Sequence, residues 1–134
     1  MKKLLALIPS VLLVISANPA QAGRIEPKPV SCYFFRGEKL EIQQTCIYES
    51  TSWAGGAAAR LQWRDGVKTA IAWGLQGRGA KPCDEVSLDK VCGSTYHRHP
   101  KTLQRISKES AMRLSANKQQ ALYCVQAGRN SVCY

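Results

Sequence analysis

The chain has 134 residues and carries 19 Lys and Arg against 9 Asp and Glu, a formal net charge of +10. This length suits a single domain with a modest core, and no apolar stretch after residue 22 is long enough to cross a bilayer. The charge says nothing about the fold, but it favours anionic partners through long-range attraction.

Residues 1–22 are predicted to be a cleavable export signal. Two lysines precede an apolar run of about twelve residues, well short of the roughly 20 that a membrane-spanning helix needs. The small residues Ala20 and Ala22 suit signal peptidase, with cleavage after Ala22. The predicted mature domain is 23–134, with a net charge of +8 because two basic residues are removed. We expect it in the periplasm or the medium; a retained N-terminal membrane anchor is the alternative.

Residues 30–35 and 40–48 predict the strands of a first hairpin. The first segment is rich in aromatic and β-branched residues, and the second alternates between apolar and polar side chains. Arg36-Gly37-Glu38 breaks the pattern between them. Residues 23–29 hold two prolines that cannot join the interior of a sheet, so we expect a short leader there.

Residues 57–73 predict a second hairpin, with its turn at Asp65-Gly66. A two-residue turn would mix polar and apolar side chains on each face. A three-residue loop instead pairs Trp63 with Val67 and gathers the apolar side chains on one face, and the two registers are exclusive. Because Gly66 can take the left-handed conformation that the longer loop requires, we predict the three-residue loop.

The tryptophans could form an aromatic platform for sugar rings or nucleobases, together with several tyrosines. Trp63 and Trp73 fall on the apolar face of the second hairpin, which favours core packing. Trp53 lies in a glycine-rich loop before that hairpin and is the better candidate for contact with a ligand.

Six cysteines in the predicted mature part favour three disulfides over a zinc site, because none of them form the close pairs typical of metal binding. Fifteen pairings are open for six cysteines. Residues 74–93 predict a surface loop closed by a bridge between Cys83 and Cys92, with Val86 and Leu88 as a small anchor. Two further cysteines near the end are placed to pair locally. The six are Cys32, Cys46, Cys83, Cys92, Cys124 and Cys133.

His97 and His99 are the only histidines of the chain. On an extended segment both imidazoles would face the same way, as an acid–base pair or as two metal ligands. Further metal ligands would have to come from Asp84, Glu85 or Asp89 in the preceding loop. We favour a solvated loop over both readings, and the sequence predicts no metal and no cofactor.

From Thr102 onward the apolar spacing changes to that of a helix, which ends at residues 117–120. Thr102 or Ser107 could cap its start. Residues 122–126 and 131–134 then predict two short strands. The residues on the apolar side of the helix are Leu103, Ile106, Ser110, Ala111 and Leu114.

Four basic residues could line one ridge of this helix region and bind phosphate or sulfate groups. Between residues 98 and 134, seven Lys and Arg stand against the single acid Glu109. Binding of this kind falls steeply with salt. The alternative is the ordinary solvent face of an amphipathic helix. The four residues are Arg98, Lys101, Arg105 and Lys108.

Taken together, the elements predict an α+β domain, a small antiparallel sheet of hairpins with four to six strands, one amphipathic helix packed on it and disulfides holding it. The stretch Leu61-Gln-Trp-Arg-Asp-Gly-Val-Lys-Thr69, flanked by paired cysteines and followed by His99-Pro-Lys-Thr-Leu103, resembles a group of small exported bacterial cysteine-containing proteins. That group has no assigned function, so the resemblance implies no activity, cofactor or catalytic residue.

The leading functional hypothesis is a non-enzymatic exported binding domain for an anionic envelope component or another polyanion, bound by the four basic residues with Trp53. A small exported hydrolase using His97 and His99 is one alternative. An inhibitor or protein-partner module, docking through residues 74–93, is another. The sequence contains no G-x-S-x-G elbow, and cysteines in disulfides cannot act as nucleophiles.

Overall fold

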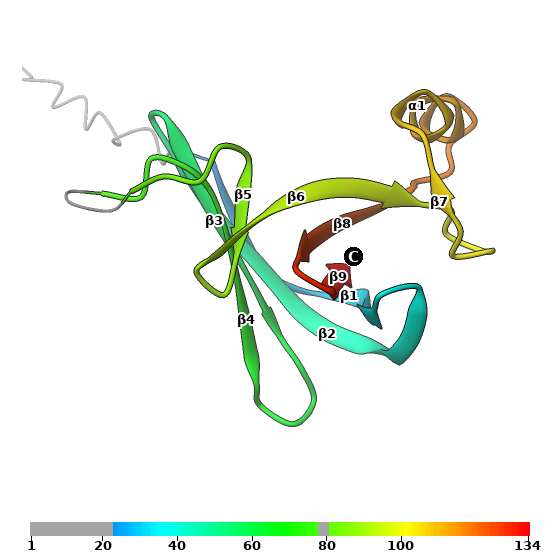
Figure 1. Cartoon of the computed structure of the whole chain (residues 1–134), viewed down its shortest axis with the longest axis horizontal. Helices are drawn as coiled ribbons and strands as arrows, with labels where there is room; N and C mark the ends of the chain where they lie inside the picture. The colour runs from blue at the N-terminus through cyan, green and yellow to red at the C-terminus, as the bar shows by residue number, and fades with distance from the viewer. Residues whose placement is uncertain (1–22, 78–80) are drawn as a thin grey trace, which may run out of the picture.

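The computed structural model describes residues 23–77 and 81–134, so the predicted export signal lies outside the described residues. Over these described residues the fold is one antiparallel sheet of nine strands with a single short helix (Figure 1). The elements are β1 (Arg24–Arg36), β2 (Lys39–Trp53), β3 (Gly56–Gln62), β4 (Lys68–Gly74), β5 (Val86–Leu88), β6 (Val91–Arg98), β7 (Arg105–Ile106), α1 (Lys108–Ala116), β8 (Leu122–Ala127) and β9 (Asn130–Cys133).

The strand pairings close into a ring, because the short strand β5 pairs with both β4 and β6. The order around the ring is β5–β4–β3–β2–β1–β9–β8–β6, and β7 adds a further pairing to β6. The prediction of four to six strands is therefore too low. The additional strands are β5, β6 and β7: β5 and β7 are very short, and β6 is mostly polar, so none gives the apolar alternation of a strand.

The β3–β4 hairpin has the predicted register. Ala57 pairs with Trp73, and Leu61 pairs with Thr69. The backbone N–H of Trp63 donates to the carbonyl of Val67 at 2.9 Å, and Gly66 has a φ of 86°, the left-handed conformation that the three-residue loop requires. The centre of the predicted apolar face is buried, while Val67 at the turn is exposed, and the period-two argument identified the register correctly.

The β1–β2 hairpin also forms as predicted, but both strands are longer than expected. Residues 23–29, predicted as a leader, largely belong to β1, and Pro29 pairs with Ile47. In the described structure β9 pairs only with residues 33–36 of β1. The prolines therefore stand in the half of β1 that has a ladder on one side, where a missing N–H is tolerated.

Apolar side chains pack on both faces of the sheet. The inner cluster lies inside the ring, and the outer cluster covers the outside of β1, β6, β8 and β9. Because side chains alternate along a strand, Cys32 and Tyr33 of β1 belong to different clusters. The buried members of the inner cluster are Cys32, Cys46, Ala59, Leu61, Trp63, Ile71, Val86, Leu88, Val125 and Val132. Those of the outer cluster are Tyr33, Phe35, Leu122, Cys124 and Cys133.

Three disulfides join Cys32 to Cys46, Cys83 to Cys92 and Cys124 to Cys133. The prediction of three disulfides is confirmed, as are the two local bridges. Val86 and Leu88 are buried, so the predicted anchor of the 74–93 loop is also confirmed. That anchor is strand β5 itself, which completes the ring.

The helix differs most from its prediction. It begins after Ser107, whose side chain accepts a hydrogen bond from the N–H of Ser110, while Thr102 lies outside it. Ala111 is the one buried residue in α1, and the helix lies beyond β7 at one end of the sheet (Figure 1). The protein is thus mostly β, and its short helix contacts the sheet at β6.

Candidate binding site

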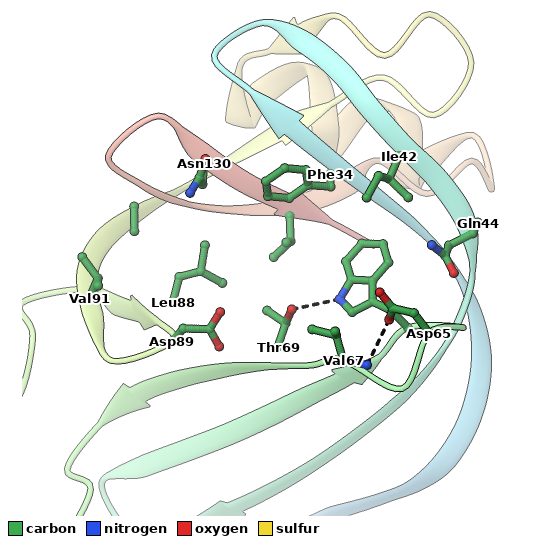
Figure 2. Close-up of a pocket in the computed structure, with 13 residues that line it drawn as sticks. Phe34, Ile42, Gln44, Asp65, Val67, Thr69, Leu88, Asp89, Val91 and Asn130 are labelled. Atoms are coloured by element: carbon green, nitrogen blue, oxygen red, sulfur yellow. Dashed lines mark hydrogen bonds between the residues drawn. The ribbon is translucent and has the colours of Figure 1, made fainter.

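A cavity of about 370 Å³ opens where three hairpin turns meet the β1–β2 pair (Figure 2). We call it the mouth cavity. Its walls come from the β3–β4 turn, the β5–β6 turn, the β8–β9 turn and the facing residues of β1 and β2. Its volume falls in the range of roughly 300–1,000 Å³ that small-molecule pockets in proteins occupy.

The floor of the mouth cavity is the end of the inner cluster. Leu88, Val132 and the partly buried Phe34 contribute aliphatic and aromatic surface. Trp63 is 7% exposed, and its indole Nε1–H donates to the Thr69 hydroxyl at 2.9 Å. This internal bond satisfies the indole, so Trp63 offers the cavity its ring rather than a polar group.

Exposed apolar side chains surround the opening. Ile42 is 42% exposed, and Val67 and Val91 are each 58% exposed. Single exposed apolar residues are ordinary on a protein surface. Three around one hollow with an apolar floor are typical of a binding site instead.

Besides Thr69, four polar side chains border the cavity, and two of them are carboxylates. Asp65 accepts the N–H of Val67 at 2.9 Å, and Asp89 accepts the N–H of Ala70 at 2.8 Å. Asp89 has a φ of 46° in the β5–β6 turn, a left-handed conformation that Asp tolerates better than most residues. The other two polar side chains are amides, Gln44 and Asn130.

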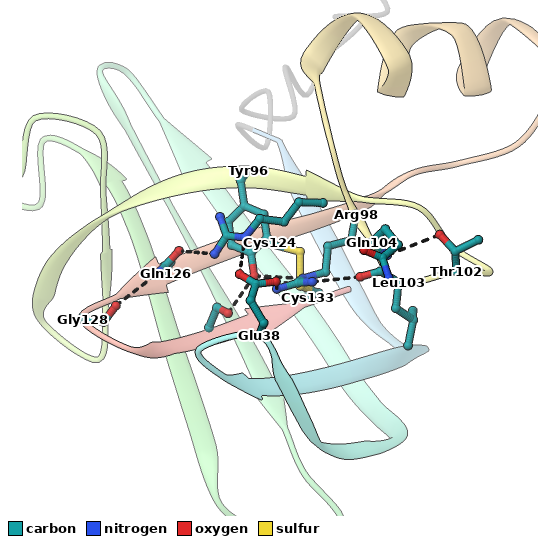
Figure 3. Close-up of polar contacts among 12 residues, drawn as sticks. Glu38, Tyr96, Arg98, Thr102, Leu103, Gln104, Cys124, Gln126, Gly128 and Cys133 are labelled. Atoms are coloured by element: carbon teal, nitrogen blue, oxygen red, sulfur yellow. Dashed lines mark hydrogen bonds and ion pairs between the residues drawn. A yellow bond between two sulfur atoms is a disulfide. The ribbon is translucent and has the colours of Figure 1, made fainter.

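Arg98, predicted to bind a ligand, is instead a buried structural residue (Figure 3). It lies on β6 rather than on the helix, and it is 2% exposed. Its guanidinium lies 3.9 Å from the centre of the Phe35 ring. Its three nitrogens donate to the Tyr96 hydroxyl, the Leu103 carbonyl and the Glu38 carboxylate. An external anion therefore cannot reach this side chain without breaking the outer cluster.

Arg105 extends the same contacts, and we call Arg98, Arg105, Glu38, Tyr96 and Phe35 the Arg98 network. The Arg105 guanidinium lies 3.9 Å from the centre of the Tyr96 ring and donates to Glu38 at 2.7 Å. This hydrogen bond, helped by the charge of Arg98, lowers the pKa of Glu38 below its usual value. Arg105 is already paired, although 41% of its side chain is exposed.

The other two predicted ligand-binding bases, Lys101 and Lys108, are exposed. Lys101 lies in the turn between β6 and β7, and Lys108 is the first residue of α1. The single helical ridge predicted for the four basic residues does not form, because β7 interrupts the segment before the helix starts.

The two histidines do not converge. His97 lies in β6, with its ring edge-on to Tyr123 at a centroid distance of 6.0 Å. The Nδ1 atom of His99 accepts the backbone N–H groups of Lys101 and Thr102, so His99 stabilises its own turn. Within residues 23–77 and 81–134, no three His, Cys, Asp or Glu side chains gather as a metal site.

Trp53 is the last residue of β2, at the tip of the β2–β3 hairpin, and it is 39% exposed. Its indole N–H donates to the carbonyl of Leu75 at 2.8 Å. Gly56 lets the ring approach, since a Cβ there would lie 2.6 Å from the indole nitrogen. Trp53 is thus partly exposed, as its candidate role requires, but it is not a lining residue of the mouth cavity.

Sequence reasoning missed the mouth cavity. It considered Asp89 only as a candidate ligand of a disfavoured metal site, and it gave Val67 and Val91 no functional role. The available signal was an apolar residue directly after each of two turns, Asp65-Gly66-Val67 and Asp89-Lys90-Val91. Alone, neither residue indicates a site; the ring closure brings them to one opening.

The fold and the cavity define a class of protein: a disulfide-linked closed sheet with an apolar cavity at one end. No family model, curated protein or solved structure matches the chain. The resemblance carried by residues 61–69 and 99–103 therefore stays a prediction. In the part of the chain that the structure describes, no helix combines the length and apolar character needed to cross a membrane.

Proposed function

We propose that this protein is an exported binding domain that takes a small, largely apolar ligand in the mouth cavity. The observation that carries the proposal is the apolar floor of the cavity, ringed by the exposed side chains of Ile42, Val67 and Val91. Burial of such side chains would stabilise the system by about 25 cal/mol for each Å² of apolar surface removed from water. A ligand that covers them recovers this free energy.

Export is supported by the sulfur chemistry. Three disulfides persist where the compartment is oxidising, which is the environment that the N-terminal export signal predicts. Two of the disulfides lie inside the clusters, and the third holds the loop that carries β5.

A titration with a neutral apolar probe tests the proposal. The oxidised protein is titrated with 4-butylbenzyl alcohol while backbone amide resonances are followed by NMR. We expect saturable shifts at residues around the cavity, such as Val67, Leu88 and Asn130. Weak, non-saturable shifts spread over the surface would contradict the proposal.

A matched pair of variants locates the binding. Ile42 and Ile47 lie on the same strand and are 42% and 40% exposed, but only Ile42 lines the cavity. Ile42→Asn is expected to weaken the alcohol several-fold, because it places an amide on the apolar wall. Ile47→Asn is expected to leave the affinity unchanged. Equal effects of the two changes would place the binding elsewhere.

The anionic partner predicted from the sequence is the second candidate. The observation that favours it is the segment from Lys101 to Lys118, where Lys101, Lys108, Arg113 and Lys118 are all exposed and the acid present is Glu109. This site would exclude the buried Arg98. Retention on heparin should fall in the variant Lys101→Gln/Lys108→Gln more than in Lys28→Gln/Lys39→Gln, which removes the same charge from β1 and β2. Equal losses of retention in the two double variants would show that heparin binding depends on the net charge alone.

A further inference from the structure

The mouth cavity is acidic although the protein is strongly basic. Asp65 and Asp89 line it, and none of its 13 lining residues is Lys, Arg or His, while the whole chain has 19 Lys and Arg. The sequence neighbours of the two aspartates, Arg64 and Lys90, do not line the cavity, and Lys90 lines a separate hollow together with Lys81. Both charged side chains that line the cavity are therefore negative.

Each carboxylate has one oxygen already used and one available. The Oδ1 atoms of Asp65 and Asp89 accept backbone N–H groups, which fixes the orientation of both side chains. Among the described residues, neither aspartate forms an ion pair; the paired acids are Glu26, Glu38, Glu41 and Glu49. The Oδ2 atoms of both aspartates accept no hydrogen bond from the described residues, so they can accept one from a positively charged group of a ligand.

The aromatic rings of the lining fit the same kind of ligand. Phe34 and Trp63 border the cavity, and the indole N–H of Trp63 is used inside the protein by Thr69. The face of an aromatic ring attracts a cation within about 6 Å of its centre. Carboxylates at the rim and aromatic rings below them are complementary to an ammonium group attached to an apolar body.

We propose that the ligand of the mouth cavity is an organic ammonium compound, whose apolar part fills the floor and whose cationic group lies between Asp65 and Asp89. This inference rests on the proposed function and adds the charge of the ligand to it. The net positive charge of the protein opposes it only weakly, because exposed charges beyond about 8 Å are screened at physiological salt.

Three probes of nearly equal size and different charge test the inference. They are 4-butylbenzylammonium, 4-butylbenzyl alcohol and 4-butylbenzoate, each titrated into the oxidised protein at low and at physiological salt. We expect the ammonium to bind roughly 3- to 10-fold more tightly than the alcohol and the benzoate to bind most weakly. The preference should shrink as salt rises.

Charge-only variants assign the preference to the carboxylates. In Asp65→Asn and Asp89→Asn the amide oxygen can still accept the N–H of Val67 or Ala70, so the turns are kept. Asp84→Asn removes the same charge from an exposed residue outside the cavity. We expect each cavity variant to lose roughly 2- to 5-fold in affinity for the ammonium and none for the alcohol, and Asp84→Asn to change neither.

The outcomes separate the two proposals. If the ammonium and the alcohol bind equally, or if Asp84→Asn acts like the cavity variants, the inference about charge fails and the apolar site stands. If none of the three probes saturates, the inference fails together with the proposed function.

Discussion

The mouth cavity and the Arg98 network lie on opposite faces of the same strands. Phe34 lines the cavity, and its neighbour Phe35 carries the buried guanidinium of Arg98. Ala127 lines the cavity, and its neighbour Gln126 accepts a hydrogen bond from Arg105. The sequence of the charged face suggests a binding site, but its hydrogen-bond donors bind groups of the protein itself. The sequence of the apolar face suggests core, but in the folded protein this face leaves an open cavity.

A pattern of charges in the sequence thus predicts a binding site only if those charges remain unpaired after folding. Arg98 is the strongest case, since all three of its nitrogens have partners. In the described structure every buried side-chain nitrogen or oxygen has a hydrogen-bond partner. Four sets of substitutions test this contrast between the two faces, and their expected effects decrease in the order given.

Replacing Arg98 should have the largest effect. Arg98→Met keeps an unbranched apolar chain over Phe35 but removes three hydrogen bonds, and we expect a loss of about 3 kcal/mol in the free energy of unfolding. Urea denaturation measures it. The control Arg113→Met, on the exposed side of α1, should change stability by less than about 0.5 kcal/mol. A loss below about 1 kcal/mol for Arg98→Met would return Arg98 to the candidates for ligand binding.

Breaking the Cys83–Cys92 disulfide should perturb the wall of the mouth cavity and leave the contacts of the Arg98 network intact. Cys92 is exposed, while the cysteines of the other two bridges are at most 2% exposed, so mild reductant should reduce Cys83–Cys92 first. Cys83→Ser/Cys92→Ser should cost about 2 kcal/mol of stability. Peptide mapping after partial alkylation checks the order of reduction. Earlier reduction of Cys124–Cys133 would contradict it.

Filling the cavity should separate binding from stability. Ala127→Leu adds a branched side chain to the lining, and we expect the affinity for 4-butylbenzyl alcohol to fall about tenfold. The free energy of unfolding should stay within about 0.5 kcal/mol of the wild type, because the new side chain occupies open space. Unchanged affinity in a stable variant would place the ligand elsewhere.

The smallest effect concerns the pH dependence of the network. The pKa of Glu38 is lowered in the folded protein, so its contribution is present above the unfolded value of about 4.3 and is lost as the pH falls through the folded value. Glu38→Gln should therefore lose less stability than the wild type between about pH 5 and pH 3. The difference should be a few tenths of a kcal/mol, since the Glu38 side chain is 67% exposed. Parallel acid profiles would rule out this role for Glu38.

Much of the fold could be predicted from local patterns. The register of the β3–β4 hairpin followed from side-chain alternation, and the two local bridges followed from short spacings. The ring closure could not be predicted, because it depends on β5, three residues between loops, and on β6, whose polar side chains hide its pairing. The helix was predicted to start too early, because Leu103 and Ile106 have helical spacing but lie before the first residue of α1.

The candidate site was less predictable than the fold. Val67 and Val91 lie 24 positions apart in the chain, and only the closed ring brings both to one opening. The basic residues, by contrast, are visible in any linear scan. Nothing in their order shows that Glu38, far away in the sequence, neutralises two of them.

The position of β5 also links formation of the Cys83–Cys92 disulfide to completion of the mouth cavity. Leu88, Asp89 and Val91 form one wall of the mouth cavity, and they belong to the loop that the disulfide between Cys83 and Cys92 closes. With reduced thiols, that wall is held by the short pairings of β5 with β4 and β6, by the burial of Val86 and Leu88, and by the hydrogen bonds between Asp89 and Ala70. We therefore expect formation of the Cys83–Cys92 disulfide to complete the proposed binding site, and the reduced protein to bind the apolar probe less tightly.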